Sequence, residues 1–202
     1  MTHITRLFSM GAALAVSATA LAGVETVTLE PIADTSIFSI GGTSNGGGAD
    51  LFAGVTGNPG LATIQRSPIR FDLSAANLPS DATIVSVSVQ LTVTQASPIA
   101  PPEDPYTLHR ISLSWGEAGS SAGGGQGDPA QENDATWADR FFPATQWQTE
   151  GGDFFVSPSA MAMVGTQPGT VVTFSDPVLA DDVAAWLLNP FGNHGWMLVG
   201  NE

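Results

Sequence analysis

Five acidic side chains crowd the middle of the chain, and they are Glu117, Asp128, Glu132, Asp134 and Asp139. Carboxylates this close in sequence suit two kinds of chemistry. Two of them facing each other across a cleft can hydrolyse a glycosidic bond, whereas several together with loop carbonyls can hold Ca²⁺. A third interpretation, that they are solvated loop charges, stays open because sequence spacing does not reveal their separation.

The metal interpretation rests on Asp128, Glu132 and Asp134, which end a loop at 116–134 that is rich in glycine, serine and acids. Their spacing is not that of an EF-hand, but flexible loops supply the oxygens that hard cations prefer. The chain has no cysteine, so disulfides cannot stabilise an exported domain of this sequence. A structural ion would stabilise it instead. We therefore predict Ca²⁺ as the candidate cofactor, with these three residues as its ligands.

Aromatic side chains offer a different chemistry, because neutral sugars stack their apolar faces on exposed rings while polar groups bind the hydroxyls. Trp137 and Trp147 flank an irregular stretch that contains Arg140. These three are the predicted ligand-binding residues, with core packing as the competing interpretation for both tryptophans. Trp115, Trp186 and Trp196 share faces with apolar residues, and we expect them in the core.

Nucleophilic catalysis has no local support, since the chain lacks cysteine and any Gly-x-Ser-x-Gly elbow. His109 shares a face with Ile111 and Leu113, so we expect it to be hydrogen-bonded and partly buried. His194 lies in a Gly-Asn-His-Gly turn, where we expect exposure. A catalytic triad is recognised by geometry and not by spacing, so no catalytic residue is predicted.

The charge balance restricts the partners. The chain has 19 acidic residues against five arginines and no lysine, which gives a net charge of −14. Such a field repels nucleic acid and anionic lipid. We expect no nucleic-acid partner and name an extracellular polysaccharide as the candidate partner, with an anionic glycan requiring a bridging cation.

The first 22 residues have the features of a secretory leader. Arg6 precedes an apolar run at 7–22, and Ala20-Leu21-Ala22 has the small-x-small pattern of a cleavage site. The alternative, a membrane anchor, is disfavoured because the run is shorter than the ~20 residues that a span needs. We predict a signal peptide at 1–22 and a single secreted domain at 23–202, with no membrane span after leader removal.

The elements that must position these residues are mostly strands. Val85, Val87, Val89, Leu91 and Val93 alternate with polar residues, which predicts a half-buried antiparallel strand over 83–95. Shorter strands are expected at 26–32, 34–40, 51–55, 64–73, 106–115, 152–156, 170–174 and 195–200, separated by turns rich in glycine and proline.

One short helix is expected near the C-terminus. Ser175 or Asp176 can cap it, Pro177 suits its first position, and Asn189 before Pro190 ends it. With roughly eight to ten strands at this spacing, the sequence predicts an all-β fold, a jelly-roll-like β-sandwich.

Several short blocks point to a known family. In order, they are ADT at 33–35, RFDL at 70–73, LPSDATI at 78–84, LHR at 108–110, WGE at 115–117, DATW at 134–137, GGDF at 151–154, DV at 182–183 and GW at 195–196. In sequence and spacing the chain resembles the DNRLRE family, the disaggregatase-related group of secreted β-sandwich domains.

The resemblance implies a non-catalytic domain that binds carbohydrate or forms part of an extracellular surface. The alternative that it implies is an extracellular polysaccharide-cleaving enzyme, for which Glu117, Glu132 and Asp134 are the candidate acids. Family members continue past Asn201-Glu202 with a further strand, so the resemblance also implies that the last C-terminal strand is missing here.

Overall fold

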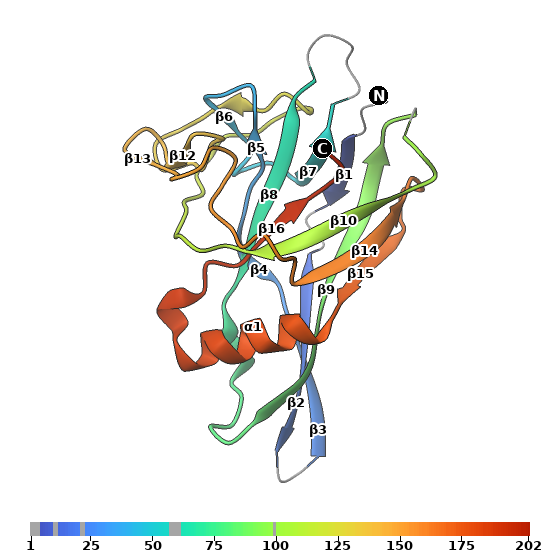
Figure 1. Ribbon diagram of the computed structural model, residues 1–202, viewed down its shortest axis with the longest axis vertical. Coiled ribbons are helices and arrows are strands. Elements are labelled where there is room, and N and C mark those ends of the chain that lie inside the picture. The colour runs from blue at the N-terminus through green and yellow to red at the C-terminus, as the bar shows by residue number, and fades with distance from the viewer. Residues whose placement is uncertain (1–4, 10–11, 21–22, 57–61, 99) are drawn as a thin grey trace.

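The computed structural model describes residues 5–9, 12–20, 23–56, 62–98 and 100–202. Within these residues the protein is built mainly from antiparallel sheets that pack together as in a β-sandwich, with one α-helix, α1 (Pro177–Leu188) (Figure 1). The predicted all-β class with one short helix near the C-terminus is confirmed. No helix of the described residues is long and apolar enough to cross a membrane.

The described residues form sixteen strands, more than predicted because several are only two residues long. They are β1 (Thr5–Ser9), β2 (Ala13–Ala20), β3 (Gly23–Leu29), β4 (Pro31–Asp34), β5 (Ile37–Phe38), β6 (Thr43–Ser44), β7 (Asp50–Val55), β8 (Ile64–Phe71), β9 (Thr83–Ala96), β10 (Glu103–Arg110), β11 (Asp128–Pro129), β12 (Asp139–Phe141), β13 (Thr145–Gln146), β14 (Ala160–Gly165), β15 (Val171–Ser175) and β16 (Trp196–Val199). Short 3-10 helices lie at Leu73–Ala76 and Pro190–Gly192.

The alternating strand β9 is the longest element, and its pattern holds with one exception. Val87, Val89, Leu91 and Val93 are buried, whereas Val85 is 53% exposed. The pairing of β9 with β2 shifts register between Ile84 and Ser86, as in a β-bulge. The extra residue reverses which side chains face inward, so Ile84 packs against the core instead of Val85.

Part of the predicted leader lies within the sheet. β2 pairs with β9 on one side and with β3 on the other, and β1 pairs with β7 and β9. Leu14 and Val16 are buried in the main core. Residues 1–4, 10, 11, 21 and 22 of the leader lie outside the described residues, and cleavage after Ala22 stays a prediction.

Several of the expected strand boundaries are wrong, including that of 34–40, where only β5 forms, and that of 26–32, which β3 and β4 divide. β10 begins at Glu103 and ends at Arg110, whereas the sequence predicts a strand over 106–115. The strand tolerates Pro105 because β16 pairs only with Thr107–Arg110. The expected strand at 152–156 is a single bridge between Ile111 and Phe154. The alternation of β14, which pairs with β10, was missed because alanine and methionine are weak strand signals.

Helix α1 begins and ends as predicted. The Asp176 carboxylate accepts a hydrogen bond from the Val178 N–H, and Pro177 occupies the first turn. The buried residues Leu179, Val183 and Trp186 face the core. The Trp186 ring lies 4.6 Å from the ring of Trp196 on β16, centroid to centroid, so the helix is packed onto the sheet by an aromatic pair.

Strand β16 separates two apolar clusters. Trp196 and Leu198 belong to the main core, which also contains β2, β9 and α1. Met197, on the opposite face of the strand, belongs to a second cluster with Trp115 and Trp147. This second cluster supports the loops that contain most of the predicted site residues.

Candidate functional site

The three predicted ligand-binding residues lie near the β12–β13 hairpin, but they differ in accessibility. Trp147 is buried, and its indole N–H donates to the Thr136 carbonyl at 2.9 Å. Arg140 donates from Nη1 to the Ser114 carbonyl and hydroxyl at 2.9 and 3.0 Å. Trp137 alone of the five tryptophans is not buried, and Trp115, Trp186 and Trp196 lie in the core as expected.

The Arg66 guanidinium covers Trp137 and forms one wall of a hollow. Its Cζ lies 4.8 Å from the Trp137 ring centroid and 5.2 Å from the Phe154 ring centroid. The hollow has a volume of about 420 Å³, and we call it the aromatic hollow. It is lined by Arg66, Ser112, Gln148, Thr149, Glu150, Gly152, Asp153, Phe154 and Val156.

The charge of Arg66 is already matched inside the protein. Its Nε and Nη2 donate to the two carboxylate oxygens of Glu202 at 2.6 and 2.7 Å, and Nη1 donates to the Gly151 carbonyl at 2.8 Å. A paired guanidinium of this kind is fixed in orientation and presents a flat face. The Arg66 side chain is therefore fixed in place, and its charge is balanced by that of Glu202.

A tight loop holds the polar rim of the hollow in place. The Asp153 carboxylate accepts hydrogen bonds from the backbone N–H groups of Gln148 and Thr149 at 2.7 and 2.9 Å. The side chains of Gln148, Thr149 and Glu150 remain exposed. The hollow thus combines one aromatic ring, that of Phe154, with an amide, a hydroxyl and a carboxylate, a set of groups that suits a polyhydroxylated ligand.

Among the residues around this hollow, the sequence predicts only Trp137 as a binding residue. Gln148, Thr149 and Phe154 were not predicted as binding residues, although the GGDF block and the polar run after Trp147 mark the loop. Arg66 was not predicted either. It comes from β8, far from the loop in sequence, and only the fold brings its side chain to Gly151.

The predicted calcium ligands do not form a ligand set. Asp134 is fully buried, and its two carboxylate oxygens accept hydrogen bonds from the N–H groups of Ala118 and Gln131 at 2.7 and 2.8 Å. Asp128 lies on β11, and Glu132 is exposed. Among the described residues no three His, Asp or Glu side chains gather as they would around a metal. Binding of Ca²⁺ by these residues stays a prediction.

A different group of titratable residues surrounds Glu117, and we call Asp34, Arg70, Glu117 and His194 the Glu117 cluster. The Asp34 N–H donates to Glu117 Oε2 at 3.1 Å. Burial, and then the charge of Asp34, raise the pKa of Glu117 from its ordinary 4.5 to about 7, against the opposing effect of Arg70. Burial also raises the pKa of Asp34.

The basic members of the cluster are half-buried. Burial, followed by the charges of Arg70 and Arg140, lowers the pKa of His194, which corrects the expectation that this side chain is exposed. Arg70 Nε is buried and has no hydrogen-bond partner within the described part of the chain. A carboxyl group that is partly protonated near neutral pH beside a second carboxyl can act as a general acid.

The raised pKa of Glu117 predicts how stability depends on pH. Between pH 4.5 and 7 the folded protein keeps a proton that the unfolded chain has released, so stability falls as pH rises through this window. Glu117→Gln removes this loss of stability at higher pH. Because Glu117 is partly exposed, solvent screening limits the gain to about 1 kcal/mol.

The measurement is urea unfolding of both proteins at pH 4 and pH 8. The free energy of unfolding of Glu117→Gln should exceed that of the original protein only at pH 8. Subtracting the two profiles removes the contribution of His194, whose lowered pKa acts in the opposite direction below pH 6.5. An equal difference at both pH values would contradict the prediction.

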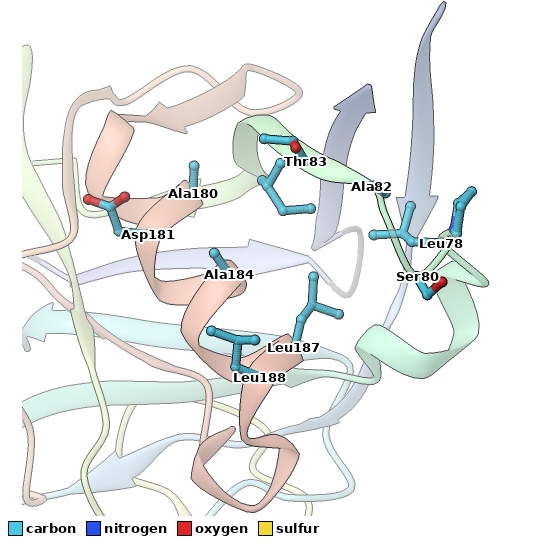
Figure 2. A pocket seen from close by; sticks show the side chains of 11 residues that line it. Leu78, Ser80, Ala82, Thr83, Ala180, Asp181, Ala184, Leu187 and Leu188 are labelled. Atoms are coloured by element: carbon cyan, nitrogen blue, oxygen red, sulfur yellow. The ribbon is translucent and has the colours of Figure 1, made fainter. Parts of the chain in front are cut away.

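A larger depression of about 610 Å³ lies between α1 and residues 78–84. Figure 2 shows Ala184, Leu187 and Leu188 on the helix side and Leu78 on the facing segment. Asp181 is its one charged lining residue, and no aromatic ring lines it. This groove lacks an aromatic surface on which a sugar could stack, whereas Phe154 lines the aromatic hollow.

Comparison of the chain with protein-family models, with curated proteins and with solved structures finds no match. The resemblance to the DNRLRE family therefore stays a prediction.

Proposed function

We propose that this protein is an extracellular, non-catalytic domain that binds carbohydrate in the aromatic hollow. The observation that supports it is the meeting of Phe154 and the Arg66–Trp137 stack with the exposed polar side chains of Gln148 and Thr149. Rings bind the apolar face of a pyranose, and amide and hydroxyl groups bind its oxygens. The predicted leader supports the extracellular location.

The ligand that this hollow suits is a neutral glycan. The Nε and Nη2 groups of Arg66 donate hydrogen bonds to Glu202. They cannot donate to a uronate or a sulfate unless the pair with Glu202 is broken. Glu150 and Asp153 add negative charge at the rim, and the chain as a whole has a net charge of −14. An anionic polysaccharide is repelled by such a surface.

The test is titration of the purified protein with neutral glucan, xylan and galactan oligosaccharides and with oligogalacturonate. Phe154→Ala and Thr149→Ala should each weaken binding of a neutral ligand by up to about ten-fold, because each removes one contact. Phe191→Ala is the matched control, since this ring is 93% exposed and does not line the hollow.

Two outcomes would contradict the proposal. One is failure of every neutral oligosaccharide to bind. The other is binding that neither hollow variant weakens relative to Phe191→Ala. Circular dichroism of Phe154→Ala is required because this ring also contacts His109, at 5.2 Å between centroids, whereas Thr149→Ala leaves that contact intact.

A second candidate function, cleavage of a polysaccharide, is favoured by one observation, the raised pKa of Glu117 beside Asp34. Release of reducing ends that Glu117→Gln abolishes, and that Thr149→Ala leaves unchanged, would support it. Cleavage that survives Glu117→Gln would remove this cluster from the mechanism.

A further inference from the structure

A third depression, of about 240 Å³, lies between the end of β10 and the last turn of α1, and we call it the Arg110 cavity. Its lining includes Arg110, Ile111, Phe155, Trp186, Asn189 and His194. These residues come from three distant parts of the sequence, so only the fold brings them together. Ser112 is the one residue that lines both this cavity and the aromatic hollow.

The Arg110 guanidinium is held from two sides but keeps donors for a ligand. Its Nη1 lies 3.2 Å from Asp182 Oδ1, and its Cζ lies 4.4 Å from the Phe155 ring centroid. Its Nε and Nη2 donate no hydrogen bond to any described residue. Arg66 differs, because both of these groups donate to Glu202 there. A fixed guanidinium with free donors binds the two oxygens of a carboxylate.

The charge around the Arg110 cavity differs from that of the protein as a whole. No acidic side chain lines it, although the net charge of the chain is −14, whereas Asp or Glu lines both the aromatic hollow and the groove beside α1. Burial, and then the charges of Arg70 and Arg140, lower the pKa of His194. Both arginines therefore make the potential at this lining residue positive. Charges farther away than about 8 Å are largely screened at physiological salt.

The apolar walls restrict which anion fits. Ile111 and Trp186 are buried, at 1 and 4% exposure, and the Phe155 ring is 47% exposed. A multiply charged inorganic anion such as phosphate would lose hydration against these walls. It would also be repelled by Asp182, which already balances part of the Arg110 charge. One carboxylate on a ring-shaped organic body matches both the single guanidinium and the apolar walls.

We propose that the Arg110 cavity binds a small monocarboxylate that contains one six-membered ring. The carboxylate pairs with Arg110, and the ring lies against Phe155 and Trp186. A cavity of about 240 Å³ admits one such ring and excludes a chain of sugar residues. The site is independent of the carbohydrate binding proposed above, because Phe155 lines this cavity whereas Phe154 lines the aromatic hollow.

The test is titration of the ¹⁵N-labelled full chain, followed by heteronuclear NMR, with benzoate and D-glucuronate as probes. The backbone signals of Arg110, Phe155 and Asn189 should shift saturably with at least one probe below about 10 mM. Whichever probe binds more tightly identifies the ring as aromatic or as that of a sugar acid. Benzamide, D-glucose and inorganic phosphate should each bind at least about ten-fold more weakly than that probe, because each lacks the carboxylate or the ring.

Two variants test the assignment of the residues. Arg110→Lys keeps a positive charge beside Asp182 but removes the planar fork, so it should weaken binding about ten-fold. Phe155→Ala should weaken binding about five-fold, because it removes the ring that contacts the guanidinium. Phe191→Ala is the matched control for the second variant, since its exposed ring does not line the cavity, and it should change binding by less than about two-fold.

Three results would overturn the proposal. The first is that neither probe shifts the cavity signals saturably. The second is that the uncharged counterparts bind as tightly as the acids. The third is that Phe155→Ala binds the probe no more weakly than Phe191→Ala does, which decides the matter even if Arg110→Lys fails to fold by circular dichroism. Failure of neutral oligosaccharides to bind the aromatic hollow leaves these expected results unchanged.

Discussion

Replacing Gly195 by alanine is expected to destabilise the protein by at least ~3 kcal/mol. Gly195 leads into β16 with φ +76°, a conformation that L side chains rarely adopt. A Cβ at this position would lie 2.0 Å from the Ile69 carbonyl oxygen and 2.9 Å from Arg70 Cα. Both neighbours are backbone atoms of β8, so relief requires β16 and β8 to move apart.

Gly169→Ala separates the two contributions to this effect. Gly169 has φ +83°, but a Cβ there would meet nothing within 4 Å. It should cost only the conformational strain, about 1 kcal/mol. Urea unfolding of both variants measures the difference. Equal losses at the two positions would contradict the close packing of β16 against β8.

Asp182→Ala should cost about 3 kcal/mol, because it leaves three groups without their partner. Asp182 Oδ2 accepts hydrogen bonds from the Ser159 hydroxyl at 2.6 Å and the Trp196 indole N–H at 2.9 Å. Its Oδ1 lies 3.2 Å from Arg110 Nη1. Asp182 is itself buried, so a cavity with unpaired donors remains after the substitution.

The neighbouring Asp181 provides the control. It has the same side chain on the same helix but is exposed, so Asp181→Ala should change stability by no more than about 0.5 kcal/mol. Thermal unfolding followed by near-UV circular dichroism reports both stability and the environment of Trp196. A loss for Asp182→Ala no larger than that for Asp181→Ala would show that the buried network contributes nothing.

The arginines explain why the ligand proposed for the aromatic hollow is neutral. Arg66 pairs with Glu202, Arg110 with Asp182, and Arg140 donates to Ser114. Arg70 lies over the Trp115 ring, 5.6 Å from its centroid, and acts on Glu117. Each arginine of residues 23–202 thus contacts other groups of the protein, although Arg70 Nε has no hydrogen-bond partner among the described residues. The chain contains no lysine.

Local sequence was sufficient for several elements. Neighbouring residues determine the alternation of side-chain direction in β9. They also determine the hydrogen bonding at the ends of α1, where the cap, the first-turn proline and the terminal asparagine lie. Trp115, Trp186 and Trp196 lie in the core, as their apolar neighbours in sequence predict.

The candidate sites depended on contacts between distant segments. Asp34 and Glu117 are 83 residues apart, and β4 and the loop after β10 must both be in place before the Asp34 N–H meets the Glu117 carboxylate. Arg66 and Glu202 are 136 residues apart. No periodicity in the chain encodes such pairs, so the aromatic hollow was predicted only through Trp137.

By itself the sequence determined the fold class, the helix, the acidic character and the leader-like apolar segment, because side-chain period, capping and composition are local properties. Only the tertiary structure decided that the Asp134 carboxylate accepts a hydrogen bond from the Ala118 N–H, that Trp147 is buried, and that residues 13–20 lie beside β9. These outcomes depend on which backbone groups of distant segments need a partner once the sheets have packed together.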